Sequence, residues 1–129
     1  MYYAPISMKT ILIAEDRDAS RELIRTVLAA AGYAVVEARD GREAIERAFQ
    51  TPADLVILDL YMPHTDGFGV LACLRDDEHY SKVPIVALTA SAMAGDREKA
   101  FASGFSEYIS KPVNLALLRQ EVGRLLGNS

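Results

Sequence analysis

The sequence predicts a doubly wound α/β fold, in which helices cover both faces of a five-stranded parallel sheet. Short apolar, β-branched runs alternate five times with amphipathic stretches, the order that produces βα units joined by right-handed crossovers. Two of these runs, at residues 54–58 and 83–88, are almost continuously apolar, as strands covered on both faces are. With 129 residues, the chain has the length of one domain with a substantial core.

The first unit begins with a strand at Thr10–Ala14 and continues with a helix over about Asp18–Ala31. Gly32 ends this helix, because glycine readily adopts the left-handed conformation that follows many helices. The apolar residues of the helix recur at the spacing of one buried face, which comprises Leu23, Ile24, Val27, Leu28 and Ala31.

The second unit has a short strand at Ala34–Ala38 and a helix that starts at the Asp40-Gly41 turn. Pro52 closes this helix, because proline cannot continue the backbone hydrogen bonding. The charged residues Arg42, Glu43, Glu46 and Arg47 mark its outer face, so the expected inner face comprises Ala44, Ile45, Ala48 and Phe49.

The remaining three units follow the same plan. Their strands are expected at Asp54–Leu58, Val83–Leu88 and Glu107–Ser110, and their helices over about Phe68–Arg75, Gly95–Ser103 and Asn114–Leu126. Within Ser91–Ser103 the apolar stripe is thin, so we expect the fourth helix to be the least firmly held; its members are Met93, Ala94, Ala100 and Phe101. The last helix has a clean stripe of Leu115, Leu118, Val122 and Leu125.

For five strands of this kind the usual order is 2-1-3-4-5, the flavodoxin-like arrangement. Strands one and three are then neighbours at the switch point, where such folds gather their functional groups beyond the carboxyl ends of the strands. Glu15 and Asp16 follow the first strand and Asp59 follows the third, so these three carboxylates should lie side by side.

Composition excludes several classes of function. A net charge of −4 and a pI near 5.1 argue against general nucleic-acid binding, and no run approaches the length of a membrane span. Cys73 is the single cysteine, which rules out an internal disulfide, fits a cytoplasmic location and, with His64 and His79 in separate settings, forms no zinc cluster.

The amino terminus has neither the basic nor the apolar region of a signal peptide. Met8 is a candidate native start, so we divide the chain into an extension at residues 1–8 and a domain at residues 9–129.

Four strand ends carry the polar groups of one site. Crowded carboxylates resist ionisation unless a cation joins them, and Mg²⁺ is the hard ion that prefers oxygen ligands. Asp16 and Asp59 would be direct ligands, with Glu15 acting directly or through water. Asp59 is also the candidate nucleophile, because an aspartate can form an aspartyl phosphate. Thr89 could donate to a phosphoryl oxygen, and Lys111 could neutralise its charge.

Each of these residues has an ordinary structural interpretation when it is taken alone. Glu15-Asp16 could cap the following helix, and Asp59 could cap the turn after its strand. Thr89 could simply end a strand, and Lys111 could be an exposed turn residue. Pro112 after Lys111 raises the chance of a cis peptide that aims the lysine inward. The four motifs together, each at a strand end, favour the functional interpretation.

From about residue 9 to residue 126 the chain resembles the receiver domains of two-component response regulators. The resemblance rests on Glu15-Asp16, on D-L-Y-M-P-x-x-D-G from Asp59 to Gly67, on A-L-T-A around Thr89 and on Lys111-Pro112.

This resemblance implies that Asp59 accepts a phosphoryl group from a histidine kinase or a histidine phosphotransfer protein. It also implies Mg²⁺ held by Asp16, Asp59 and the main-chain carbonyl of Tyr61, with Glu15 assisting. Thr89 and Lys111 would contact the phosphoryl group. Tyr108 matches an aromatic switch residue, although it could also be a half-buried strand residue.

The same resemblance implies how the signal leaves the domain. Phosphorylation would switch the face formed by the fourth helix, the fifth strand and the fifth helix, which would control a protein partner. Tyr61 and Ser91 flank the path of a hydrolytic water and could tune the phosphoryl lifetime. The downstream target and a phosphorylation-dependent homodimer stay open, as does the choice between a stand-alone regulator, which we favour, and a receiver of a longer protein.

Three other classes compete with this interpretation. A phosphatase of the haloacid-dehalogenase type needs a second aspartate where this chain has Tyr61, so we expect no turnover of external substrates. A flavodoxin-type flavin module needs a hydroxyl- and glycine-rich phosphate loop, and the segment AEDRDAS offers carboxylates instead. A purely structural interaction domain would not need a complete set of acidic and basic site residues.

Overall fold

The computed structural model describes residues 8–90 and 95–127 and contains one five-stranded sheet with helices on both sides. The strands are β1 (Thr10–Ala14), β2 (Ala34–Ala38), β3 (Leu55–Asp59), β4 (Ile85–Thr89) and β5 (Glu107–Ser110). The helices are α1 (Asp18–Ala30), α2 (Gly41–Gln50), α3 (Gly67–Arg75), α4 (Asp96–Ser103) and α5 (Leu115–Leu125). Ser91, Met93 and Ala94, which entered the expectations above, lie outside the described residues, as does the extension up to residue 7.

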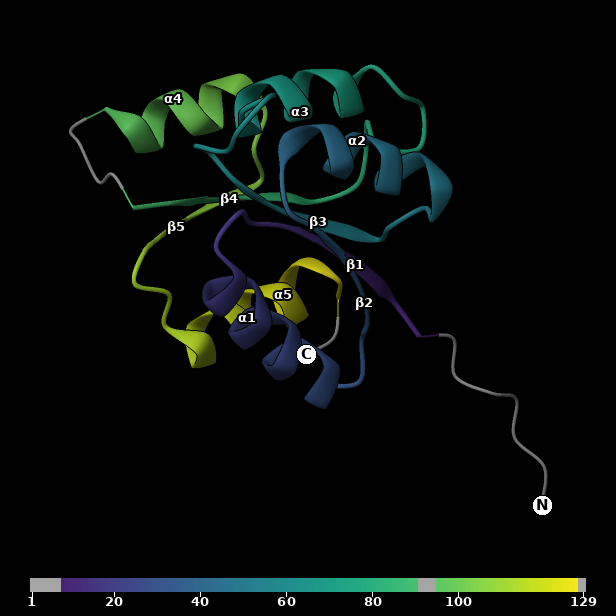
Figure 1. Cartoon of the computed structure of the whole chain (residues 1–129), viewed down its shortest axis with the longest axis vertical. Helices are drawn as coiled ribbons and strands as arrows, with labels where there is room; N and C mark the ends of the chain where they lie inside the picture. The colour runs from purple at the N-terminus through teal and green to yellow at the C-terminus, as the bar shows by residue number, and fades with distance from the viewer. Residues whose placement is uncertain (1–7, 91–94, 128–129) are drawn as a thin grey trace.

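All strand pairs are parallel, and the order β2-β1-β3-β4-β5 confirms the predicted flavodoxin-like fold. Helices α1 and α5 lie on one side of the sheet, and α2, α3 and α4 lie on the other (Figure 1). Because every crossover returns the chain to the same edge, the carboxyl ends of all five strands meet at one edge. This edge is where the site is expected.

The apolar core has two parts, one on each face of the sheet, because successive side chains of a strand point to opposite faces. On β1, Ile11 and Ile13 face α1 and α5, while Leu12 and Ala14 face the opposite helices. Every residue of β3 and of β4 is buried, as expected for central strands covered on both faces.

Element boundaries agree with the sequence to within two residues. The strand predicted at Val83–Leu88 begins at Ile85, because Pro84 has no backbone N–H to donate to a ladder. Val83 is nevertheless buried, which explains why the apolar run looked longer than the strand.

Two predicted core residues are exposed. Leu23 is 57 % exposed and Phe49 is 50 % exposed, so including them in the buried faces was wrong. Helix α1 meets the sheet chiefly through Ile24 and Leu28, which leaves Leu23 at the side. Phe49 lies at the end of α2 and packs edge-on against the buried ring of Tyr80, with 5.9 Å between the ring centres.

Helix α4 is weakly anchored, as predicted. Among its eight described residues only Ala100 is buried, while Phe101 is 39 % exposed with the Arg97 guanidinium 5.2 Å from its ring centre. In the described part of the chain, no helix has the length and apolar character needed to cross a membrane.

Candidate functional site

The acidic pair sits where the chain leaves β1. Glu15 is completely buried, and its backbone N–H donates to the carbonyl of Ala38 at 3.1 Å, which extends the pairing with β2 by one residue. Asp16 is exposed. Two adjacent carboxylates therefore have different surroundings, one inside the domain and one in solvent.

Asp59 ends β3, one strand away from the acidic pair, and is 4 % exposed. Its Oδ1 accepts a hydrogen bond from the backbone N–H of Tyr61 at 3.0 Å, and its Oδ2 lies 2.7 Å from Nζ of Lys111. The side chain of Tyr61 is exposed, so at this position the chain contributes backbone groups to the site and a ring to the surface.

The close packing behind Asp59 requires a glycine at the start of α3. A Cβ atom on Gly67 would lie 2.6 Å from the Asp59 carbonyl oxygen and 2.8 Å from the Cα atom of Leu60. Any larger residue would have to displace the backbone that carries Asp59.

Lys111 connects both parts of the acidic cluster. Its Nζ lies 2.7 Å from Oε2 of Glu15 and 2.7 Å from Oδ2 of Asp59, and the side chain is 12 % exposed. The Lys111–Pro112 peptide is cis, in line with the expectation from the proline. The two contacts and the low exposure show that the ammonium points into the domain, so Lys111 is not an exposed turn residue.

Thr89 and Tyr108 lie on β4 and β5, the two strands that follow β3 in the sheet. Thr89 is completely buried at the end of β4, and its carbonyl accepts from the backbone N–H of Lys111 at 2.7 Å. Tyr108 is partly buried beside Ala87 in the sheet register. Burial and the nearby charge of Asp96 raise the pKa of the Tyr108 hydroxyl, so this hydroxyl is neutral at physiological pH.

The crowding of charged groups in this cluster changes the pKa values of Glu15 and Lys111. Burial, followed by the neighbouring Asp59 carboxylate, raises the pKa of Glu15 from 4.5 to about 7, although Lys111 acts in the opposite direction. Burial alone would lower the pKa of Lys111, but the hydrogen bonds to Asp59 and Glu15 outweigh it and raise that pKa. One ammonium therefore does not fully compensate the carboxylates around it.

The three carboxylates have the geometry of a cation site. Glu15, Asp16 and Asp59 can each offer one oxygen, and these oxygens lie within 4.8 Å of one another. Carboxylate oxygens suit Mg²⁺, which keeps several waters and takes only one or two protein carboxylates directly. The residues at this strand edge therefore fit the ion that the sequence suggests.

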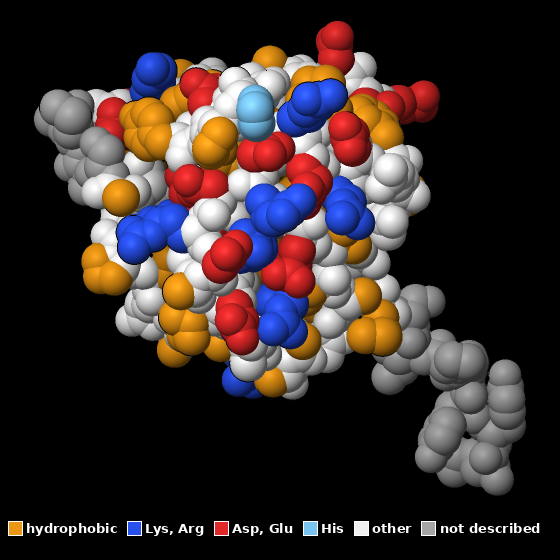
Figure 2. Space-filling model, viewed as in Figure 1, with side chains coloured by type: hydrophobic (Ala, Val, Ile, Leu, Met, Phe, Trp, Pro, Cys, Tyr) orange, Lys and Arg blue, Asp and Glu red, His pale blue; other side chains and the backbone are white. Residues whose placement is uncertain are grey.

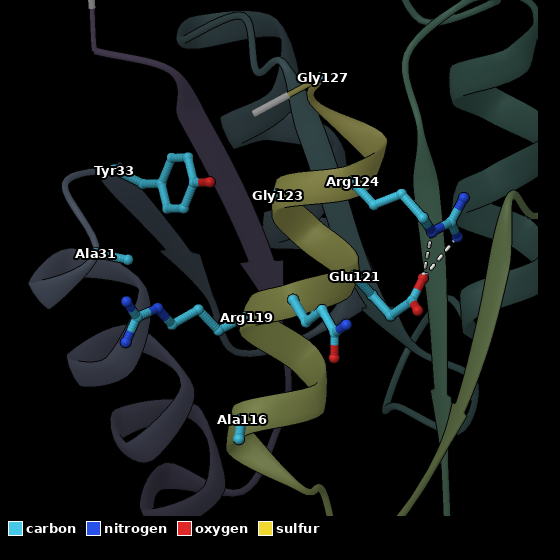
Figure 3. Close-up of a pocket in the computed structure, with 9 residues that line it drawn as sticks. Ala31, Tyr33, Ala116, Arg119, Glu121, Gly123, Arg124 and Gly127 are labelled. Atoms are coloured by element: carbon cyan, nitrogen blue, oxygen red, sulfur yellow. Dashed lines mark hydrogen bonds and ion pairs between the residues drawn. The ribbon is translucent and has the colours of Figure 1, made fainter. Parts of the chain in front are cut away.

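A larger hollow lies away from the acidic cluster. It has a volume of about 960 Å³ and lies between α5 and the turn from α1 to β2, with Tyr33, Arg119 and Arg124 around it (Figure 3). A smaller hollow of about 470 Å³ opens beside Lys111 and is lined by Leu23, among others. Of these two hollows in the described part of the chain, the smaller one adjoins the acidic cluster.

Comparison with known proteins places this architecture in a family. The family model for the response regulator receiver domain matches residues 11–123. The chain belongs to the response regulator receiver family. It is thus a receiver domain of two-component signalling, as the motifs indicated.

Individual relatives cover almost the whole chain. The polar-differentiation response regulator DivK of Brucella ovis is 34 % identical over 121 residues, which cover 94 % of this chain and 98 % of that protein. The receiver domain of the sensor histidine kinase PA1611 of Pseudomonas aeruginosa, solved with a magnesium ion coordinated in its active site cleft, is 33 % identical with a TM-score of 0.85 and covers 94 % of this chain and 99 % of that one. The receiver domain of the Saccharomyces cerevisiae response regulator Ssk1, solved with the histidine phosphotransfer protein Ypd1, is 29 % identical with a TM-score of 0.83 and covers 92 % of this chain and 88 % of that one.

The sequence indicated the charged groups that meet at this edge of the sheet, but it did not indicate one contact beside them. Nη1 of Arg21 donates to the Glu15 carbonyl oxygen at 2.9 Å. The signal was in the sequence, because Arg21 lies three and seven residues before Ile24 and Leu28 and so shares their buried stripe.

Proposed function

We propose that this receiver accepts a phosphoryl group on Asp59 from a phosphohistidine of a histidine kinase or a histidine phosphotransfer protein, in a reaction that requires Mg²⁺. The observation that carries the proposal is the convergence of Glu15, Asp16, Asp59 and Lys111 at one edge of the sheet. A purely structural domain would gain nothing from the buried carboxylates of Glu15 and Asp59, whose charge Lys111 compensates incompletely.

Phosphoryl transfer needs positioning and charge neutralisation more than covalent help from the protein. A carboxylate oxygen of Asp59 forms the new bond to phosphorus while the P–N bond of phosphohistidine breaks, and the imidazole leaves with the bonding electrons. Lys111, already 2.7 Å from Asp59, neutralises charge on the phosphoryl oxygens. The hydroxyl of Thr89 donates to one of them.

The cation would be held by Asp16, Asp59 and the main-chain carbonyl of Tyr61, with Glu15 assisting. When bound, it neutralises the crowded carboxylates and the incoming phosphoryl oxygens. No turnover of external phosphoesters is expected, because Tyr61 stands where a phosphatase of similar chemistry has its acid–base aspartate. The protein assists only its own phosphorylation and dephosphorylation.

The donor protein would dock on the hollow beside Lys111. This hollow is mainly apolar, lies next to the acidic cluster, and has Leu23 on its rim, more than half exposed on α1. A phosphohistidine on a partner helix must reach Asp59 from solvent, so the partner has to cover the surface around the strand ends. The complex of Ssk1 with Ypd1 shows that a related receiver pairs with a protein of this class.

Output would pass through the face formed by α4, β5 and α5. Moving a switch from mostly off to mostly on takes about 5.5 kcal/mol of differential stabilisation, and charge-assisted bonds to Thr89 and Lys111 are strong enough to contribute to it. Tyr108 would turn inward as Thr89 shifts. Helix α4 suits a moving part because it is weakly anchored.

The first test is the intact mass of the protein after incubation with a small-molecule phosphodonor, with and without Mg²⁺, beside Asp59→Asn. The proposal expects one Mg²⁺-dependent phosphoryl adduct that is absent in the variant. No adduct with any donor would contradict it and would favour phosphorylation-independent binding.

The output face needs its own test, because phosphorylation alone does not identify it. Charge reversal at Arg97 or Lys99 should alter self-association or partner binding while leaving phosphorylation intact. Unchanged association in both variants would contradict the assignment of the output surface to this face.

A further inference from the structure

Arg21 lies beside the acidic cluster, has several side-chain hydrogen bonds and has no role in the proposed reaction. Its side chain is 12 % exposed. Besides the bond to the Glu15 carbonyl, Nε donates to Oε1 of Glu37 at 3.2 Å and Nη2 donates to Oδ1 of Asp18 at 2.7 Å. One guanidinium thus ties together the end of β1, the strand β2 and the start of α1.

The bond to Glu15 occurs where the chain leaves the sheet. The N–H of Glu15 still pairs with β2 through Ala38, but its carbonyl accepts from the Arg21 side chain. A buried carbonyl without a donor is costly, so this peptide would turn toward water if the guanidinium were removed. The same peptide joins Glu15 to Asp16, and its orientation sets the direction in which Asp16 leaves the strand.

We propose that Arg21 is a positioning residue for the divalent-cation site: by fixing the Glu15–Asp16 peptide, it holds both carboxylates within reach of Asp59. The inference rests on the proposed function, because it concerns the cation that phosphorylation requires. Groups that orient metal ligands through hydrogen bonds commonly influence affinity as strongly as some ligands do.

The direction of the change in Mg²⁺ affinity distinguishes a positioning role of Arg21 from an effect of its charge alone. Arg21 is a cation close to a cation site, so loss of its charge alone would strengthen Mg²⁺ binding. Loss of the peptide anchor would weaken Mg²⁺ binding instead. Weaker binding after removal of a positive charge is the result that positioning predicts and electrostatics does not.

Helix α1 also supplies a matched control. Arg25 lies one turn after Arg21 and shares its acceptor, with Nε 3.5 Å from Oε2 of Glu37 and Nη2 4.0 Å from Oε1 of Glu22. It is 39 % exposed, and its ion pairs are with these side chains and not with the Glu15 peptide. Arg25→Met therefore removes the same charge and a Glu37 pair while leaving the peptide anchor in place.

The experiment is calorimetric titration of Mg²⁺ into the wild type, Arg21→Met and Arg25→Met, combined with the phosphorylation rate at saturating Mg²⁺. Arg21→Met should raise the Kd for Mg²⁺ about tenfold, as loss of an outer hydrogen-bonding partner does at other metal sites. Arg25→Met should stay within about twofold of the wild type, since exposed ion pairs contribute little. At saturating Mg²⁺ the rate of Arg21→Met should approach that of the wild type, because Asp59, Thr89 and Lys111 are untouched.

Equal Kd values for the two variants, or tighter binding by Arg21→Met, would overturn the inference. If Arg21→Met does not fold, Arg21→Lys takes its place: the charge is kept, but an ammonium cannot reach all three acceptors, so weaker Mg²⁺ binding is again expected and unchanged binding overturns the inference. A wild type that binds no Mg²⁺ would instead contradict the proposed function itself.

Discussion

Glu15→Gln should stabilise the metal-free protein but weaken its cation site. The folded protein raises the pKa of Glu15 from 4.5 to about 7, so between these pH values unfolding releases a proton. The free energy of unfolding therefore falls as pH rises through this window. Above pH 7 the wild type carries a buried negative charge that glutamine does not have.

The magnitude follows from the same pKa. At about 1.4 kcal/mol per pH unit, the ionised carboxylate costs roughly 3 kcal/mol at pH 8. The attraction of Lys111 for the ionised carboxylate is already included in the raised pKa of about 7, so it does not reduce this gain further. We expect Glu15→Gln to be about 3 kcal/mol more stable at pH 8 and close to the wild type at pH 5.

Urea denaturation in a metal chelator at pH 5 and pH 8 measures this difference, and a rise of roughly 9–15 °C in Tm should accompany it at pH 8. Excess Mg²⁺ should reduce the difference in stability between Glu15→Gln and the wild type, because it stabilises the wild type more than the variant. Glu46→Gln is the control, because Glu46 is exposed and its ion pair with Arg42 is long, at 3.9 Å. Its effect on stability should be small at both pH values. A gain of equal size at pH 5 and pH 8, or no gain at pH 8, would refute the reasoning.

Three further variants test other parts of the account. Leu23→Ser should slow transfer from a phosphorylated histidine phosphotransfer protein but not from a small-molecule donor, because only the protein donor has to dock. Tyr80→Phe should lower the free energy of unfolding by about 1–3 kcal/mol in urea denaturation, since the buried Tyr80 hydroxyl accepts from the N–H of Ala53 and donates to the carbonyl of Ala48. Gly67→Ala should cost about 1–3 kcal/mol and slow phosphorylation, because its Cβ would displace the Asp59 backbone.

The Leu23 and Tyr80 variants each have a counterpart on the same chain. Leu117→Ser removes another exposed leucine, on α5 and away from the lining of the hollow, and should leave both donors unaffected. Tyr61→Phe removes the hydroxyl of an exposed tyrosine and should not change stability. Equal effects within either pair would contradict the roles given to Leu23 and Tyr80.

One face of the described surface carries charges of both signs. Basic and acidic side chains are interspersed over the face shown in Figure 2. In the described part of the chain, ion pairs join Arg21 with Asp18 and Arg39 with Glu43. Such pairing leaves no extended basic field on that face for a phosphate backbone.

Much of the fold was predictable, because it depends on local patterns. The first two strands and the last occupy the predicted residues, since β-branched runs bounded by turns need no knowledge of distant partners. Leu23 and Phe49 were misjudged because helical periodicity identifies a face but not its width. That width depends on how closely the helix approaches the sheet.

The sequence by itself determined which chemical groups the protein has and at which strand ends they lie. Only the tertiary structure decided that Glu15 is buried while Asp16 is exposed, and that Lys111 bonds to Glu15 from 96 positions away. It also decided that Arg21 holds the peptide between the two acidic residues. The physical reason is that burial and electrostatic interaction depend on distance through space, which the fold sets, whereas strand and helix periodicity depend on spacing along the chain.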